Sequence, residues 1–302
     1  MKSLVRISVA VAALGLVINA RAIEPKDVEV VVDALTVTTF QDWKAKANKG
    51  DLQAPVIVGR AYAEAKGTTQ NYAEALAWYK KALTYGNPLA AYFLGGIYEL
   101  GRGVPKNDKQ AFSYYKQAAE NGIAAAQNSV GVFYGSGRGT TRDLVQAVKW
   151  HRLAAEKGDA GGQSNLGYFY ESGMGGLRQD YGQALKWYRL SAEQGDDDGE
   201  YNLGLLYFRG NGVPKSFRES EKWFRKAAEQ DMSEAQNDLG ILYFLGGDGL
   251  PQNLAEAHKW LWIASERDVA RGKPTLEHLR QQMTPDEVAR AERAGRDWIS
   301  AH

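Results

Sequence analysis

Residues 203–207, Leu-Gly-Leu-Leu-Tyr, followed by the turn Gly-Asn-Gly-Val-Pro at 210–214, decide the fold because they are one copy of a repeated pattern. Each copy has an aliphatic residue, then a glycine that we call the landmark glycine, then a tyrosine three residues later. The landmark glycines are Gly59, Gly95, Gly131, Gly167, Gly204 and Gly240, spaced 36, 36, 36, 37 and 36 residues apart. A constant period of this size indicates stacked structural repeats.

Composition excludes several classes of function. The 302 residues carry 37 basic and 36 acidic side chains, a net charge of +1, and no basic stripe, so we expect no nucleic-acid partner. There is no cysteine, which removes disulfides, a thiol nucleophile and any cysteine-based zinc site. The composition is that of an ordinary globular protein with a large core.

The first 22 residues have the pattern of a secretory signal peptide. Lys2 and Arg6 precede an apolar run over 7–18, and Ala20 and Ala22 form the small-residue site for cleavage before Ile23. The alternative is an uncleaved membrane anchor, but the apolar run is short for a span. No later segment is apolar enough to cross a membrane. We therefore predict a periplasmic or secreted protein, without an integral span after cleavage near Ala22.

The first half of each repeat is a predicted helix. A small residue five before the landmark glycine, an aliphatic residue just before it and the tyrosine three after it share one helix face. Glycine costs about 1 kcal/mol relative to alanine inside a helix. We expect it to be needed for the close approach of a neighbouring backbone.

A glycine-rich turn and a second helix complete the repeat. The turn glycines permit positive φ, and proline after them prevents the first helix from continuing. A phosphate-binding loop is excluded because that motif requires G-x-x-x-x-G-K-[ST] between a strand and a helix. The second half repeats Ala-x-x-Trp-aromatic-x-x-small, as in Ala184, Trp187, Tyr188 and Ser191, which places rings and small residues on one stripe.

The combined pattern, over residues 51–270 as six units, resembles the Sel1-like repeat family, a branch of the helical tetratricopeptide-like repeats. The first unit departs from it by lacking the Gly-x-Gly-Val turn, and the fourth and sixth carry an extra loop residue. The resemblance implies a right-handed α-solenoid that acts as a protein-interaction scaffold. Exported bacterial members of the family serve as envelope regulators, parts of secretion or polysaccharide machines, or host-contact factors.

The sequence thus predicts an all-α chain in four parts: a signal peptide (1–22), an N-terminal arm and half-repeat cap (23–50), a solenoid of about six two-helix repeats (51–273) and a C-terminal helical cap (274–302). Residues 23–38 are rich in β-branched residues, so they form either a helix or an extended arm. Thr284 to Glu287 reads as a capping box. The final helix is predicted to bury Val288, Ala291, Ala294 and Trp298.

No catalytic, cofactor-binding or metal-binding residue is predicted. His151 and His258 occupy different positions of distant repeats, so a shared metal site is not expected, and each is interpreted as a partly buried or surface side chain. Asp196, Asp197 and Asp198 lack the pattern of a calcium loop and are interpreted as helix N-capping together with favourable negative charge at a helix N-terminus. No cofactor follows from any motif.

Candidate partner-binding residues come from the positions that vary between repeats. These lie three before, one after and four after the landmark glycine, and we call the surface they define the variable face. The predicted partner-binding residues are Tyr92, Asn128, Tyr168, Tyr201, Leu205, Phe208, Ile241 and Phe244. They form either an exposed apolar patch that binds a partner or additional core.

The sequence is compatible with two functions. The favoured hypothesis is a non-enzymatic scaffold of the bacterial envelope that binds a protein or peptide along the solenoid groove, as a regulator or assembly factor. The alternative is a cell-wall or β-lactam-active hydrolase of the kind reported among cysteine-rich Sel1-like proteins. The absence of cysteine weakens that analogy. The sequence does not decide the oligomeric state.

Overall fold

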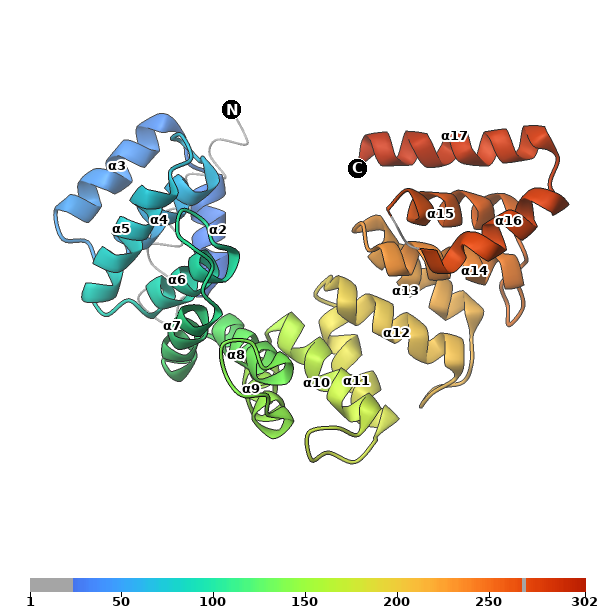
Figure 1. Ribbon diagram of the computed structural model, residues 1–302, viewed down its shortest axis with the longest axis horizontal. Helices are drawn as coiled ribbons and strands as arrows, with labels where there is room; N and C mark the ends of the chain where they lie inside the picture. Colours follow the sequence, from blue (N-terminus) through green and yellow to red (C-terminus); the bar gives the residue numbers. More distant parts are fainter. Residues whose placement is uncertain (1–23, 268–269) are drawn as a thin grey trace. The chain divides into compact units, whose positions relative to one another are not determined.

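The computed structural model describes residues 24–267 and 270–302, which form sixteen α-helices and one short 3₁₀ turn (Figure 1). This part of the chain contains no β-strand. The helices are α2 (Pro25–Asp33), α3 (Val37–Asn48), α4 (Ala54–Glu64), α5 (Tyr72–Thr84), α6 (Pro88–Leu100), α7 (Asp108–Glu120), α8 (Ala124–Ser136), α9 (Leu144–Glu156), α10 (Ala160–Ser172), α11 (Tyr181–Ala192), α12 (Asp197–Arg209), α13 (Phe217–Glu229), α14 (Ser233–Leu245), α15 (Leu254–Glu266), α16 (Lys273–Gln282) and α17 (Pro285–Ala301).

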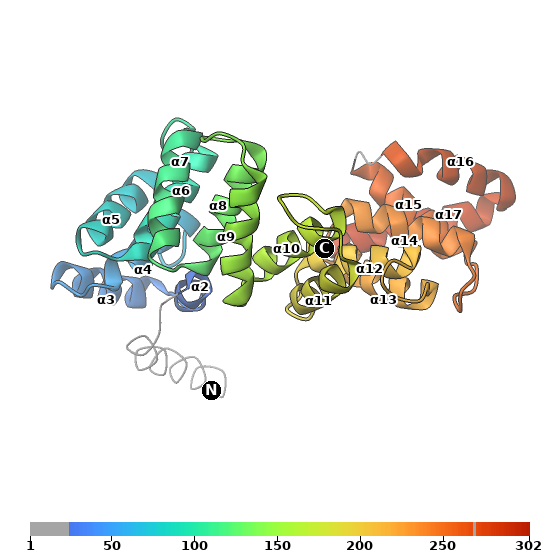
Figure 2. The ribbon, with the colours of Figure 1, turned by 90° about the horizontal axis from the view of Figure 1, so that it is seen from below.

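The chain up to Gly162 and the chain from Gln163 on form two compact units. In the first unit, α4 with α5, α6 with α7 and α8 with α9 are helical hairpins, and Figure 2 shows the last two pairs side by side. In the second unit, α12 with α13 and α14 with α15 are the corresponding hairpins. The predicted all-α repeat architecture is therefore confirmed.

Every hairpin is closed by the same backbone contact. The residue that caps the second helix donates its N–H to the carbonyl of the tyrosine three after the landmark glycine, as from Asn107 to Tyr98 at 2.8 Å. Its side chain then accepts an N–H from the first turn of the helix, as Asn107 does from Gln110 at 3.0 Å. The tyrosine position therefore fixes the hairpin through its backbone as well as its ring.

The landmark glycine packs against a side chain in each repeat, which corrects the expected contact with a neighbouring backbone, although a Cβ on Gly240 would also meet the backbone of Ala257 and Leu261 at 3.0 Å. A Cβ on Gly95 would lie 2.6 Å from the ring of Tyr115 in the second helix of the same hairpin. The side chains in this place, which we call the ring position, are Tyr79, Tyr115, His151, Tyr188, Phe224 and Leu261. Only the last is not a ring. A flat side chain pressed on the helix backbone excludes even a methyl group.

The first repeat begins its turn as the second repeat does, although it lacks the first glycine. Ala65 occupies the left-handed C-cap with a φ of 59°, where the second repeat has Gly101 with a φ of 68°. Alanine is strained in this region, whereas glycine is not. The second turn glycine is required for space, since a Cβ on Gly103 would lie 2.6 Å from Cβ of Tyr72 in the preceding hairpin.

The N-terminal arm is helical, and Pro25 opens α2. Val28, Val31 and Val32 are buried in the core of the first unit, so tertiary packing overrides the low helix propensity of β-branched residues. Glu24 accepts the N–H of Ala124 at 3.2 Å, at the start of α8. The predicted signal peptide, residues 1–22, lies outside the described residues.

The C-terminal helices cover the last hairpin. Lys273 and Pro274 lie in the first turn of α16, where proline is tolerated, instead of breaking the chain. The predicted capping box between Thr284 and Glu287 is present at the start of α17. The predicted apolar face needs one correction. Ala294 is exposed and Gly295 is buried against the ring of Trp262, because a helix advances 3.6 residues per turn.

Candidate binding face

The predicted partner-binding residues of the second unit are half-buried and pack against the core. Tyr201 lies 5.5 Å from Phe224 between ring centroids, and Phe208 stacks on Phe217 at 5.3 Å. Leu205, Ile241 and Phe244 are also half-buried against this core. Tyr168 differs, because 49% of its side chain is exposed. The variable face of this unit therefore has one exposed aromatic side chain, and its other predicted binding residues are partly buried.

A polar group joins the variable face of the second unit to the segment before α16. The Tyr201 hydroxyl donates to Asp238 at 2.9 Å, and Arg271 forms an ion pair with the same carboxylate. Burial, and next the Asp238 charge, raise the pKa of Tyr201 to about 12. The hydroxyl therefore keeps its proton at neutral pH and acts as a donor.

In the first unit, Asn128 of the variable face is paired with a buried histidine. Its Oδ1 lies 2.8 Å from Nδ1 of His151, which is 2% exposed and occupies the ring position. Burial lowers the pKa of His151 to about 4. His258 is also fully buried, so the expectation that both histidines are partly buried or at the surface was wrong.

Two repeats contain a tyrosine, a glutamate and an arginine in contact, which the sequence analysis missed. Tyr115 donates to Glu99 at 2.7 Å, and Glu99 forms an ion pair with Arg138. The glutamate stands four after the landmark glycine, and the tyrosine is in the ring position. The fourth repeat has a second copy in Tyr188, Glu171 and Arg209. The sequence does contain a signal for this pairing. A glutamate four after the landmark glycine occurs only in repeats whose ring position is a tyrosine.

A pocket of about 210 Å³ opens between the first and second repeats. Its wall includes four positions of the variable face: Arg60, Ala63, Tyr92 and Gly96. The remaining lining residues are Tyr72, Tyr79, Phe93, Ile97, Leu100, Arg102 and Tyr115. The volume is below the range of sites for drug-sized ligands, so the pocket is suited to a single side chain.

One side of the pocket is already charged. The Arg60 guanidinium forms ion pairs with Glu64 of its own helix and, at 3.3 Å, with Glu29 of α2. The Arg60 group also lies 5.1 Å from the centre of the Phe93 ring. The arm helix α2 therefore places an acidic side chain on the same face as the pocket.

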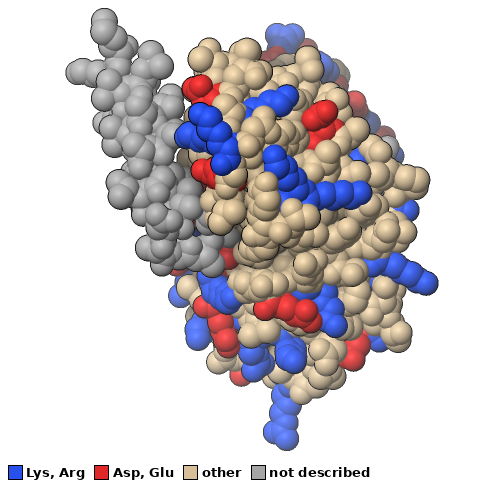
Figure 3. Space-filling view, turned by 90° about the vertical axis from the view of Figure 1, so that its left-hand side faces the viewer, with Lys and Arg blue, Asp and Glu red and all other residues tan. Residues whose placement is uncertain are grey.

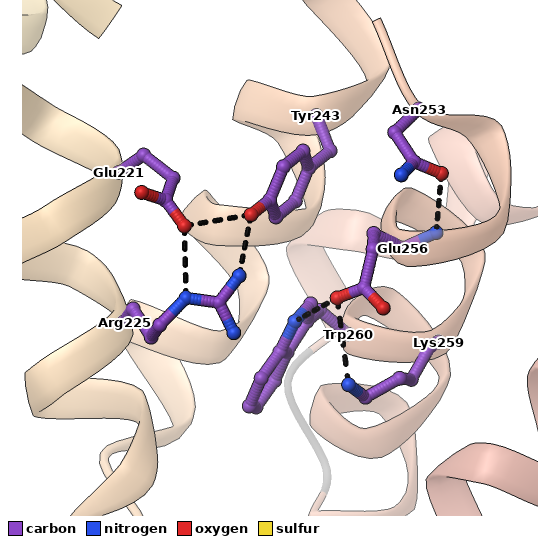
Figure 4. A network of polar contacts seen from close by, with 7 residues as sticks. All are labelled: Glu221, Arg225, Tyr243, Asn253, Glu256, Lys259 and Trp260. Carbon is purple, nitrogen blue, oxygen red and sulfur yellow. Dashed lines mark hydrogen bonds and ion pairs between the residues drawn. The ribbon is translucent and has the colours of Figure 1, made fainter. Parts of the chain in front are cut away.

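Other polar contacts of the second unit either join α13 to α14 or lie within α15 and its cap (Figure 4). Tyr243 of α14 points toward α13, donates to Glu221 at 2.7 Å and accepts from Arg225. In α15, Glu256 accepts from the Trp260 indole at 3.0 Å. Each polar atom drawn with a dashed line has its partner within the chain, which is typical of a structural network.

Charge does not gather into one sign on the face seen in Figure 3, which is the left-hand side of Figure 1. Lysine and arginine side chains are interspersed there with acidic ones. Within the described residues, no group of three or more histidine, aspartate or glutamate side chains could hold a metal ion. The described helices also include none that is long and apolar enough to span a membrane.

Asp196 caps α12 by accepting the N–H of Gly199 at 2.9 Å, as predicted.

The recurring hairpins, with their common turn and ring position, define a helical-hairpin repeat protein. A model of the Sel1 repeat matches six segments: residues 57–84, 88–123, 124–159, 160–196, 197–232 and 233–269. The matched segments cover more than half of the chain, which therefore belongs to the Sel1 repeat family. The sequence matches no curated protein.

A solved structure agrees with this assignment. A Sel1 repeat protein from Oxalobacter formigenes is 29% identical, with a TM-score of 0.67 over 76% of this chain and 96% of its own. A protective antigen of uropathogenic Escherichia coli is 25% identical, with a TM-score of 0.39 over 88% of this chain and 72% of its own. Only the first likeness is close enough to support the fold.

Proposed function

We propose that this protein is an exported binding scaffold of the bacterial envelope, and that its variable face binds a protein or peptide as part of regulation or assembly. Membership of the Sel1 repeat family supports interaction with proteins as the general role. The signal-like sequence of residues 1–22 supports export. The observation that carries the proposal is the pocket between the first two repeats, because its wall includes four variable positions.

The mechanism is preorganisation. Hairpin caps, buried rings and the turn glycines hold the variable face of each unit in place before a partner arrives. A rigid face loses little conformational entropy on binding, so most of the ordering cost falls on the partner. Aromatic side chains around the pocket supply contact area with few rotatable bonds.

Site-specific cross-linking in cells tests this function. A photoreactive phenylalanine replaces Leu100, which lines the pocket and is 59% exposed. The matched control replaces Val145 of α9, which is 61% exposed and does not line the pocket. We expect a discrete cross-linked protein from position 100 and none from position 145. Equal labelling at both positions, or none at position 100, would contradict a binding role for the pocket.

Export is tested separately by measuring the mass of the protein recovered from the envelope fraction. The proposal predicts a chain that begins at Ile23. Recovery of a chain that retains residues 1–22 would contradict cleavage, and recovery only from the cytoplasmic fraction would contradict export.

A further inference from the structure

We propose that the pocket between the first two repeats binds an acidic side chain of the partner, whose carboxylate takes the place that a glutamate of this chain occupies in the second repeat. The inference rests on the proposed function, because it names the chemistry that the binding face recognises. The repeats themselves provide the comparison.

The second repeat shows the complete arrangement. The Tyr115 hydroxyl and the Arg138 guanidinium both contact the carboxylate of Glu99, from the ring position and from the turn of the following repeat. The fourth repeat repeats this chemistry: Tyr188 donates to Glu171 at 2.8 Å, and Arg209 pairs with the same glutamate at 3.4 Å. A tyrosine in the ring position and an arginine therefore bind a carboxylate twice in one chain.

The equivalent positions of the first repeat lie 36 residues earlier in the chain. Tyr79 is equivalent to Tyr115, and Arg102 is equivalent to Arg138, so both carboxylate-binding side chains are retained. Glu99 becomes Ala63, so the carboxylate is missing. All three residues line the pocket. The pocket thus contains Tyr79 and Arg102, the counterparts of the hydroxyl donor and the cation of the second repeat. Ala63 stands where the second repeat has its acidic side chain.

The two retained side chains have unused binding capacity. Tyr79 is 1% exposed, and its hydroxyl has no hydrogen-bond partner among the described residues. Because Tyr79 lines the pocket, an acceptor on a ligand can take up the hydrogen bond that this hydroxyl does not make within the described residues. Arg102 contacts the Tyr72 ring at 5.8 Å and forms no ion pair within residues 24–267 and 270–302. Burial raises the pKa of Tyr79, which keeps the hydroxyl protonated as a donor.

The contrast with other repeats argues against simple loss of the contact. In the fifth repeat the ring position is Phe224, and the residue at the glutamate position is Phe208, whose ring lies 6.5 Å away. There the hydroxyl and the carboxylate are both replaced by apolar groups. The first repeat keeps the tyrosine and removes only the acid, which leaves a polar pocket instead of a closed core.

The acid is expected to come from a side chain, and α2 is the precedent. Glu29 reaches Arg60 from a separate helix that lies on this face. A partner segment that passes beside α2 would present an aspartate or glutamate to Arg102 and Tyr79 in the same manner. An arginine–carboxylate contact with a tyrosine donor is charge-assisted, so an uncharged amide should bind more weakly.

The test uses the mature chain and blocked tripeptides followed by NMR titration. Acetyl-Ala-Glu-Ala-amide is compared with acetyl-Ala-Gln-Ala-amide, and acetyl-Ala-Ala-Ala with a free carboxylate tests the chain end as a source. We expect shifts around the pocket with the glutamate peptide and at least fivefold weaker binding of the other two. Equal binding of the glutamine peptide would contradict recognition of a carboxylate. Tighter binding of the free-ended peptide would show that the carboxylate comes from a chain end and not from a side chain.

Variants locate the site. Tyr79→Phe and Arg102→Gln should each weaken the glutamate peptide at least fivefold, whereas Lys109→Gln, an exposed change on α7 outside the pocket, should not. Ala63→Glu should supply the carboxylate from within, abolish peptide binding and raise the midpoint of thermal unfolding by about 2–4 °C. Unchanged peptide binding by Tyr79→Phe and Arg102→Gln, or a lower midpoint for Ala63→Glu, would overturn the proposal.

The two proposals fail in different ways. If the cross-link at position 100 forms equally in wild type and Ala63→Glu, the scaffold function stands and the acidic ligand is rejected. If the cross-link never forms, the proposed function itself is rejected.

Discussion

The second and third repeats place different side chains against the same kind of glycine. Tyr115 and His151 both bring a ring atom to 2.6 Å from where a Cβ would stand on Gly95 and Gly131. Their polar atoms then diverge, because Tyr115 contacts Glu99 and His151 contacts Asn128. The comparison teaches that two different rings can fill the same place on the glycine, whereas the polar partner of each ring comes from the variable positions.

Removing the ring should have the largest effect. Tyr115→Ala leaves a cavity over Gly95 and takes the donor from Glu99, so we expect a loss of about 4 kcal/mol of unfolding free energy. His151→Ala removes a smaller ring and should cost less. Denaturant unfolding of both variants measures the difference. A smaller loss for Tyr115→Ala than for His151→Ala would break the comparison.

The second-largest difference between the two repeats should be in how their contribution to stability depends on pH. Folding lowers the pKa of His151 to about 4 from an ordinary value near 6.5. As pH falls from about 6.5 to 4, the unfolded chain binds a proton that the folded chain does not, so stability falls by about 3 kcal/mol from this group. The contribution is constant above the unfolded pKa. His151→Tyr, which copies the second repeat, should remove that part of the slope in unfolding measured across this range. An unchanged slope would contradict the assignment.

Adding a methyl group to the glycine should have a smaller effect. Gly95→Ala brings a Cβ against the Tyr115 ring, and overpacking of this kind costs about 2 kcal/mol. Gly96→Ala is the matched control, because its Cβ would meet only the Tyr115 hydroxyl at 3.5 Å. Better helix propensity should make that variant up to about 1 kcal/mol more stable. Thermal unfolding that shifts in the same direction for both variants would show that propensity, not the ring, controls this position.

Removing only the hydroxyl should have the smallest effect. Tyr115→Phe takes one hydrogen bond from Glu99, and we expect a loss of about 1 kcal/mol. Tyr79→Phe removes a hydroxyl that has no partner among the described residues, so its unfolding free energy should be unchanged or slightly higher. Chemical denaturation compares the two. Equal losses would indicate that the Tyr79 hydroxyl has a partner after all.

Sequence alone predicted the features that the period and local chemistry determine. The landmark glycines predicted the six repeats, and Thr284 with Glu287 predicted the start of α17. It missed the side chain that packs on each glycine. A neighbouring backbone and a neighbouring ring both require glycine at that position, so the sequence does not distinguish them. It also missed the contact from Tyr115 through Glu99 to Arg138, since this depends on which way long side chains turn between adjacent hairpins. The β-branched arm was ambiguous because its burial against the first repeats decides its conformation.

The contact between Glu24 and the N–H of Ala124 has a kinetic consequence. Most contacts in a repeat protein join residues within about one period, so hairpins can form and stack from local encounters. Glu24 and Ala124 are separated by 100 residues, and closing a loop of that length before the intervening repeats exist is entropically costly. We therefore expect the contact between Glu24 and Ala124 to form after the third repeat has folded, so that protection of the Ala124 amide from hydrogen exchange reports the completion of the first unit.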